Sequence, residues 1–212
     1  MAVAGPTLGL SFEVRWKPFF LDGSLPGGEG KDKAAHYQMK FGAARVAQMQ
    51  PTMQRTFADA GLPTYNLGGR VGNTLDSHRL MELALQQGGP ALQDALVERM
   101  FDDYFIKGLA LSDKSVLLSA AAAAKVDGAE ALLKGDDLTE DVFALVRARK
   151  AHTSARAVPH PRPVLFSQVE DAYGAGVSGV PHFVIGGKAH VSGGQEAKVF
   201  LDIFREIAAS PQ

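Results

Sequence analysis

The sequence predicts an α/β fold in which a small sheet is interrupted by a large helical insert. Three observations indicate this fold: a segment of period-2 alternation near the N-terminus, a helix-rich middle, and a strand, turn, strand and helix pattern near the C-terminus. Of the 212 residues, 46% are hydrophobic and 21% are charged, so the chain is long enough to bury a substantial core. We expect one compact domain, or one domain that carries an insert.

The first expected strand lies at residues 12–19. Apolar and charged side chains alternate there, as in Phe12, Glu13 and Val14, and the alternation ends at Pro18. Such alternation is typical of a half-buried strand, and proline lacks the N–H group that a central strand needs. Residues 12–20 are therefore assigned to the sheet.

The expected helical insert spans residues 31–150. In its first part, residues 31–60, Gly42 and Pro51 interrupt the helix-forming sequence, which favours two or three short helices over one long helix.

The rest of the insert predicts four helices. Asn73 or Thr74 can cap the first, a Gly-Gly-Pro sequence separates it from the second, and Ser112 can cap the third. The expected spans are about residues 75–87, 91–105, 112–126 and 138–150.

Residues 151–165 are expected to be an irregular loop, because Pro159, Pro161 and Pro163 forbid a helix and lack hydrogen-bond donors. A short helix is expected at residues 166–172.

A hairpin and a final helix complete the pattern. The apolar run 183–185 is followed by Gly186-Gly187 and by a second short strand at residues 188–191. Residues 195–209 then place apolar side chains on one helical face, as in a helix packed on a sheet.

Four stretches together resemble a known family. Residues 176–185 (GVSGVPHFVI) resemble the segment that leads into the third strand of thioredoxin folds, where a valine or threonine precedes a cis-proline. The resemblance narrows to the FrnE-type branch of the DsbA-like family because of three further stretches, residues 12–19, 72–80 and 191–195. This branch is related to kappa-class glutathione transferases and 2-hydroxychromene-2-carboxylate isomerases. The resemblance covers most of residues 12–146 and 170–208, in the same order along the chain.

The resemblance implies a thioredoxin-like core and a separate insert. The core would be formed by residues 12–20 and 166–209, the helical insert by residues 31–150, and the Pro- and Arg-containing loop by residues 151–165. Both the fold and these boundaries are expectations at this point.

The chain departs from the family at its N-terminus. In that family a first strand and a helix that opens with Cys-x-x-Cys precede the strand that resembles residues 12–19, whereas here only Met1 to Ser11 precede it and the chain has no cysteine. The N-terminal βα unit is therefore expected to be missing. Since the family's first strand lies inside the sheet, its loss would leave backbone groups unpaired, so we expect a truncated form or a chain that needs a partner strand.

The resemblance implies a protein of the thiol-disulfide oxidoreductase family without its own dithiol, and it leaves no catalytic residue in this chain. The alternatives are a non-catalytic module that binds glutathione or a peptide, and a relative of the glutathione-dependent isomerases. The expected partner is accordingly a peptide thiol or disulfide, or glutathione. No cofactor is expected, with glutathione as the alternative to none.

Five residues are candidates for substrate binding. The backbone of Val180, before Pro181, can pair with an extended peptide or with glutathione like an added strand; the alternative is an ordinary turn before a strand. Ser192, Gly193 and Gly194 precede the last helix, whose free N–H groups can receive a carboxylate. A purely structural role at the helix start is the alternative.

Other polar residues favour structural roles. Asn73, Asp76 and His78 are expected to cap and pack a helix rather than to act as an acid or base. The histidines lack metal-binding spacing with carboxylate support, so no metal site is expected at His152, His160, His182 or His190. The basic run at Arg147, Arg149, Lys150, Arg156 and Arg162 has no interleaved aromatic side chain and is interpreted as a solvated linker.

Composition weighs against two classes of partner. A net charge of −1 and a pI near 6.6 give no field that favours nucleic acid. No window approaches the length of a membrane helix, and residues 1–14 carry no Lys or Arg for a signal peptide, so a cytoplasmic location is expected.

Overall fold

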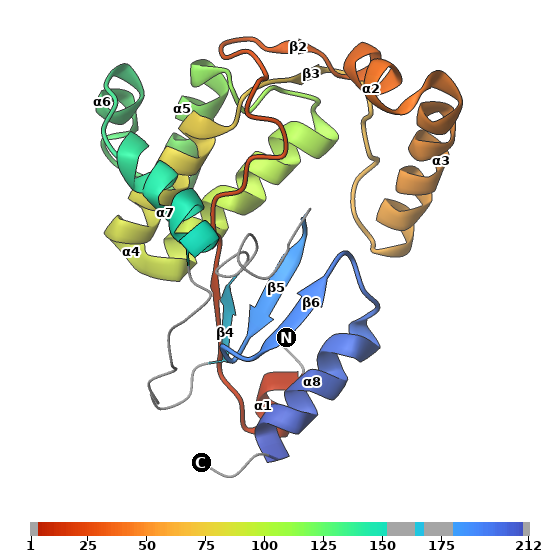
Figure 1. Cartoon of the computed structure of the whole chain (residues 1–212), viewed down its shortest axis with the longest axis vertical. Coiled ribbons are helices and arrows are strands. Elements are labelled where there is room, and N and C mark those ends of the chain that lie inside the picture. The colour runs from red at the N-terminus through yellow and green to blue at the C-terminus, as the bar shows by residue number, and fades with distance from the viewer. Residues whose placement is uncertain (1–3, 152–163, 168–179, 210–212) are drawn as a thin grey trace. The chain divides into compact units, whose positions relative to one another are not determined.

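The computed structural model describes residues 4–151, 164–167 and 180–209 (Figure 1). The chain divides into two units, one formed by residues 1–21 and 140–212 and the other by residues 22–139. Each unit has a hydrophobic core of its own. The sheet lies in the first unit, together with the candidate binding residues.

The first unit contains a four-stranded sheet in the order β1-β4-β5-β6. Strands β1 and β4 are parallel, whereas β4 and β5, and also β5 and β6, are antiparallel. Strand β4 therefore lies inside the sheet and pairs on both sides. The strands are β1 (Phe12–Arg15), β4 (Val164–Ser167), β5 (His182–Ile185) and β6 (Ala189–Ser192).

Helix α8 (Ala197–Ala209) supplies much of the core of this unit. The side chains of Ile185 and Phe204 are 0% and 3% exposed, and the rings of Phe12 and Phe204 lie 4.8 Å apart. The short helix α1 (Ala4–Leu8), which the sequence had not indicated, contacts α8 (Figure 1). The expected amphipathic face of residues 195–209 is thus the face that packs on the sheet.

The expected hairpin is present. Gly186 and Gly187 have φ values of 60° and 70°, and the N–H of Lys188 donates to the carbonyl of Ile185 at 3.2 Å. Positive φ at two successive residues matches the right-handed twist of a hairpin, and glycine adopts it without steric strain. The second strand begins at Ala189, one residue later than expected.

Three sequence predictions are corrected around the sheet. Phe166 and Ser167 lie in β4 and not in a helix, and the strand begins at Val164, inside the stretch expected to be irregular. The reason is non-local: β4 satisfies main-chain groups of both β1 and β5, which outweighs a local helical preference. Strand β1 also ends at Arg15, earlier than expected. Residues 152–163 and 168–172 lie outside the described residues.

Helix α7 (Thr139–Ala151) matches the last helix expected for the insert, but from Glu140 onward it belongs to the sheet unit. Its Val142 is 0% exposed, and the ring of Phe143 lies 6.0 Å from that of Phe20.

The second unit is mostly helical. Helix α4 (Leu75–Phe101) packs with α5 (Lys114–Ala124) and α6 (Ala129–Lys134) around side chains that include Leu80, Leu96 and Leu117, each 0% exposed. The break expected at Gly88 and Gly89 is a kink with non-helical backbone angles inside α4. A short π-helix, η1 (Asp102–Ile106), then continues the chain.

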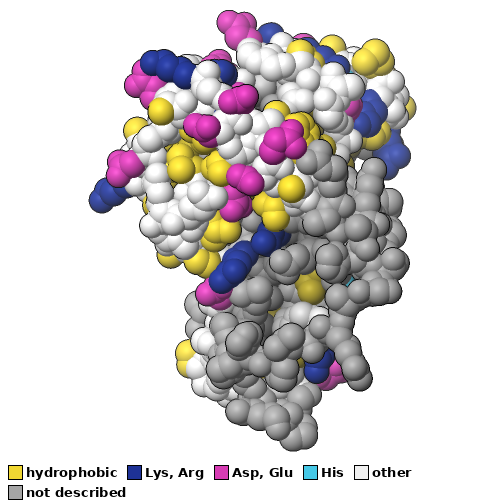
Figure 2. Space-filling model, turned by 60° about the vertical axis from the view of Figure 1, so that its left-hand side comes forward, with side chains coloured by type: hydrophobic (Ala, Val, Ile, Leu, Met, Phe, Trp, Pro, Cys, Tyr) yellow, Lys and Arg dark blue, Asp and Glu magenta, His cyan; other side chains and the backbone are white. Residues whose placement is uncertain are grey.

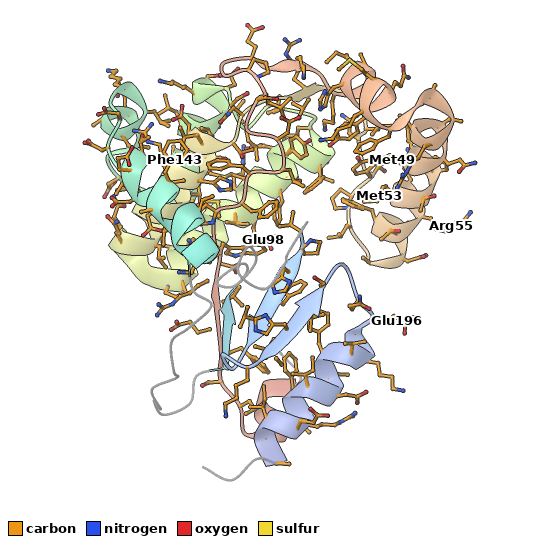
Figure 3. All side chains as sticks on the ribbon, viewed as in Figure 1. Met49, Met53, Arg55, Glu98, Phe143 and Glu196 are labelled. Atoms are coloured by element: carbon orange, nitrogen blue, oxygen red, sulfur yellow. The ribbon has the colours of Figure 1, made fainter. Side chains whose placement is uncertain are left out.

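A smaller core lies beside α2 (Lys33–Phe41) and α3 (Ala43–Asp59). The helices are separated at Gly42 as expected, but Pro51 lies inside α3 and does not interrupt it, which corrects the sequence prediction. This core contains Val46, Tyr65 and Leu67, with Met49 and Met53 packed against it. Figure 3 shows Met49 and Met53 on one side of α3 and Arg55 on the other. The strands β2 (Lys31–Asp32) and β3 (Arg70–Val71) form a small antiparallel pair that the sequence had not indicated.

The cap of α5 differs from the expectation. Asp113, not Ser112, is the capping residue, since its carboxylate accepts the N–H of Ser115 at 2.8 Å. The hydroxyl of Ser112 instead donates to the carbonyl of Gly28 at 2.7 Å and joins two distant segments.

Among the described residues, no helix has the length and apolar character needed to cross a bilayer. On the face drawn in Figure 2, acidic side chains are scattered over the described residues, and the Lys and Arg side chains shown there do not gather into one large patch.

Arg79 joins the start of α4 to the turn after α6. It is 3% exposed and donates to the carbonyls of Leu132, Gly135 and Asp137 at 2.7–2.8 Å. It also forms an ion pair of 2.6 Å with Asp76. The guanidinium thus binds three carbonyls at the C-terminal end of α6 and in the turn that follows it.

We predict that Arg79→Ala lowers the free energy of unfolding of the helical unit by about 3 kcal/mol, because it leaves buried carbonyls and a partly buried carboxylate without partners. Urea unfolding followed by circular dichroism measures this change. Lys134→Ala is the control, since Lys134 is 75% exposed and should change stability by less than about 0.5 kcal/mol. Equal effects of the two substitutions would contradict the assigned role of Arg79.

Candidate functional site

The segment before β5 presents an exposed residue next to an anchored one. The Val180–Pro181 peptide bond is cis. The carbonyl of Pro181 accepts the N–H of Gly193 at 2.8 Å, which extends the pairing of β5 and β6 by one residue, whereas Val180 is 37% exposed. Pro181 is therefore held by the hairpin, whereas Val180 lies outside the paired region.

The main chain of Val180 lies just beyond the hairpin pairing, which ends at Pro181 and Gly193. Within the described part of the chain, Val180 makes no hydrogen bond, and β4 pairs with β5 only at Val184 and Ile185.

The segment before α8 offers fewer hydrogen-bond donors to an anion than its sequence suggests. The N–H of Gly193 is already donated to Pro181, and the side-chain amide of Gln195 donates to the carbonyl of Ser192 at 2.9 Å. Glu196, which Figure 3 labels, immediately precedes the helix. A carboxylate at this position repels an incoming anion, and the expected anion site keeps only part of its donors.

The hairpin carries a hydrogen-bonded network on the face opposite the hydrophobic core. This network was not predicted from the sequence. Ser192 Oγ lies 3.1 Å from Nδ1 of His182, and Nε2 of His182 lies 3.2 Å from Nδ1 of His190. His182 is 4% exposed, whereas Ser192 and His190 are exposed. The signal was present in the hairpin, since residues 182 and 192 are register partners across the Gly186-Gly187 turn.

The other polar candidates serve structure. Thr74 is the N-cap residue of α4 and makes no side-chain cap hydrogen bond, whereas the side chain of Asn73, one residue earlier, accepts the N–H of Leu75 at 2.9 Å. Asp76 pairs with Arg79. His78 Nε2 lies 3.3 Å from Thr74 Oγ1. These contacts agree with capping and packing rather than with acid–base chemistry.

The histidines do not gather into a metal site in the described ranges. His182 and His190 are neighbours, but no group of three or more metal-ligating side chains occurs in residues 4–151, 164–167 and 180–209. His152 and His160 lie outside the described residues, as do Arg156 and Arg162.

Lys33 is a second group that the sequence reasoning missed. It is 1% exposed, and its Nζ donates to the carbonyl of Tyr104 at 3.1 Å and lies 4.0 Å from the ring of that residue. Burial lowers the pKa of the Lys33 ammonium to about 8. With almost no access to solvent, Lys33 is a structural group that joins the start of α2 to η1.

The pKa of Lys33 predicts how stability depends on pH. Between the folded pKa of about 8 and the ordinary value of 10.5, the unfolded chain holds the Lys33 proton and the folded chain does not. The contribution of Lys33 to stability therefore rises with pH across that window. Lys33→Met should abolish this rise, so the difference in free energy of unfolding between wild type and variant should be constant below about pH 8 and change above it.

Urea unfolding between pH 7 and about pH 10.5 measures this difference. Lys134→Met, which alters an exposed lysine, is the control and should show no such window. A wild-type minus Lys33→Met difference that stays flat across the whole range would contradict the buried, perturbed ammonium.

The sheet order, the hairpin and the large helical unit together define a thioredoxin-like fold with a helical insert. A probable DsbA oxidoreductase from Streptomyces coelicolor shares this fold, with a TM-score of 0.71 and 21% sequence identity. The match covers 92% of this chain and 75% of that one.

The family model described as the DSBA-like thioredoxin domain matches residues 7–158. The chain therefore belongs to the DSBA-like thioredoxin domain family. No curated protein matches the sequence. The finer resemblance to the FrnE-type branch stays a prediction.

Proposed function

We propose that this chain binds extended peptides through the main chain of Val180 and performs no thiol chemistry of its own. The observation that carries the proposal is that Val180 is exposed and lies just beyond the β5–β6 pairing, with no hydrogen bond to it within the described part of the chain. An extended peptide laid antiparallel to this segment would add a strand there.

The absence of thiols defines what the chain can do after binding. Thiol-disulfide exchange requires a thiolate, and the 212 residues include no cysteine. Binding without exchange is what remains to these residues. One or two main-chain hydrogen bonds contribute only about 0.5–1.5 kcal/mol each, so we expect a weak interaction, with Kd on the order of 10 mM or above.

Peptide main chain is favoured over the carboxylate of glutathione. The N–H of Gly193 is committed to Pro181, and Glu196 places negative charge at the start of α8. Both features weaken anion binding at Ser192, Gly193 and Gly194. Glutathione therefore serves as a comparison ligand in the test.

If the protein is an oxidoreductase, the main chain of Val180 would serve a different purpose. In a longer form of the protein with a cysteine pair ahead of Phe12, Val180 would hold a peptide disulfide for attack. The intact mass of the endogenous protein distinguishes the two interpretations: a species heavier than 22.5 kDa with alkylatable thiols supports the longer form.

We predict that a cysteine-free heptapeptide of alternating Thr and Val, acetylated and amidated, shifts the amide resonances of Val180 and His182 in an NMR titration. Two N-methylated versions of the peptide provide the decisive comparison. N-methylation at residues that face the protein removes the paired N–H groups and should abolish the shifts, whereas N-methylation at the alternate residues should preserve them.

Matched protein variants complete the test. Val180→Ala keeps the N–H of residue 180 and should bind, and Val180→Pro removes it and should not. Equal binding of both N-methylated peptides would contradict main-chain pairing. Shifts confined to Ser192, Gly193 and Gly194 on addition of reduced glutathione would instead identify anion binding at α8.

A further inference from the structure

We propose that Ser192 is an activated nucleophile, with His182 as its general base and His190 as the residue that orients the base. The network lies on β5 and β6 and uses none of the main-chain groups assigned to peptide binding. The inference is therefore independent of the proposed peptide binding.

The geometry meets the requirements for serine activation. A serine nucleophile needs a base within hydrogen-bond reach and a third group that orients the base. The distance from Ser192 Oγ to His182 Nδ1 is 3.1 Å, and the distance from His182 Nε2 to His190 Nδ1 is 3.2 Å.

Two assignments of protons satisfy both contacts with neutral rings. The proposed reaction uses the assignment in which the hydroxyl of Ser192 donates to Nδ1 of His182 and Nε2 of His182 donates to Nδ1 of His190. In this tautomer the basic nitrogen of His182 faces the serine hydroxyl.

Burial and exposure are distributed as the reaction needs. His182 is 4% exposed and lies directly opposite Ser192 in the hairpin, so its ring has little freedom to leave the serine. Ser192 itself is exposed at the end of β6, where a substrate can reach it. The hairpin pairing on either side, from Ile185 and Ala189 to Pro181 and Gly193, fixes both backbones.

The chemical class of substrate follows from the third group. The orienting group is an imidazole, which stabilises a neighbouring imidazolium less than an ionised carboxylate does. We therefore assign the site to activated acyl groups, such as aryl esters and thioesters, rather than to amides.

With an aryl ester the step is balanced. Ser192 Oγ bonds to the carbonyl carbon, its proton passes to His182, and the bond to the phenolate breaks. Water then hydrolyses the acyl-serine and regenerates the hydroxyl, with release of the carboxylate.

The test uses a fluorophosphonate ester, because its adduct is not readily hydrolysed. Ser192 Oγ bonds to phosphorus, fluoride leaves, and the proton passes through His182 to solvent. Peptide mass mapping should locate the label on Ser192, at a rate about 100-fold above that of Ser24, the low end for a positioned base. Ser24 is the matched control, since its hydroxyl contacts the Asp22 carboxylate at 2.6 Å.

Variants separate chemistry from folding. His182→Gln should reduce labelling of Ser192 to the rate of Ser24, and Ser24→Ala should leave it unchanged. Should His182→Gln prove unfolded by circular dichroism, the exposed His190 decides the matter: His190→Ala should slow labelling, and His190→Asn, which keeps a hydrogen-bonding group, should restore part of it. Labelling of Ser192 at the rate of Ser24, or labelling unaffected by the histidine substitutions, would overturn the proposal.

Discussion

The main-chain pairing of β5 with β6 is the constraint on which the candidate sites depend. It places Ile185 and Val191 in the core of the sheet unit, and by the period-2 rule it places His182, His190 and Ser192 on the opposite face. The pairing extends to Pro181 and Gly193 and ends there, so Val180 lies just beyond it. One hairpin therefore positions both of the proposed sites.

The parts of the fold that the sequence predicted are those with local causes. Gly186-Gly187 forms the turn of the hairpin, the apolar spacing of Phe200 and Phe204 marks the buried face of α8, and Gly88-Gly89 breaks a helix in the insert. The location of Val180 and Pro181 was likewise visible in the sequence. Each of these features depends on residues a few positions apart.

The parts that the sequence did not predict depend on distant partners. Val164–Ser167 is a strand because β1 and β5, each far away along the chain, pair with its two edges. Lys33 is buried because carbonyls of Asn66 and Tyr104 receive its ammonium. The contact of His182 with Ser192 depends on the register of the hairpin, in which the two residues lie opposite each other. The Gly186-Gly187 turn sets this register, but only helical spacings were considered for metal-binding histidines.

Membership of the DSBA-like family and the absence of cysteine together restrict the function of these residues. The chain contains no cysteine, so the two proposed sites rest on the main chain of Val180 and on the hydroxyl of Ser192. One proposed site uses a main-chain group and the other uses side chains, so either can be removed by substitution while the other is kept.

Amide hydrogen exchange of the full chain, with and without the Thr/Val peptide, tests the central claim most directly. The account predicts that the Val180 amide of the free protein exchanges much faster than the amides of Phe183 and Ile185, and that the peptide slows exchange at Val180 while leaving the β5–β6 hairpin unchanged. An amide of Val180 already as protected as that of Ile185, or one that the peptide does not slow, would contradict it.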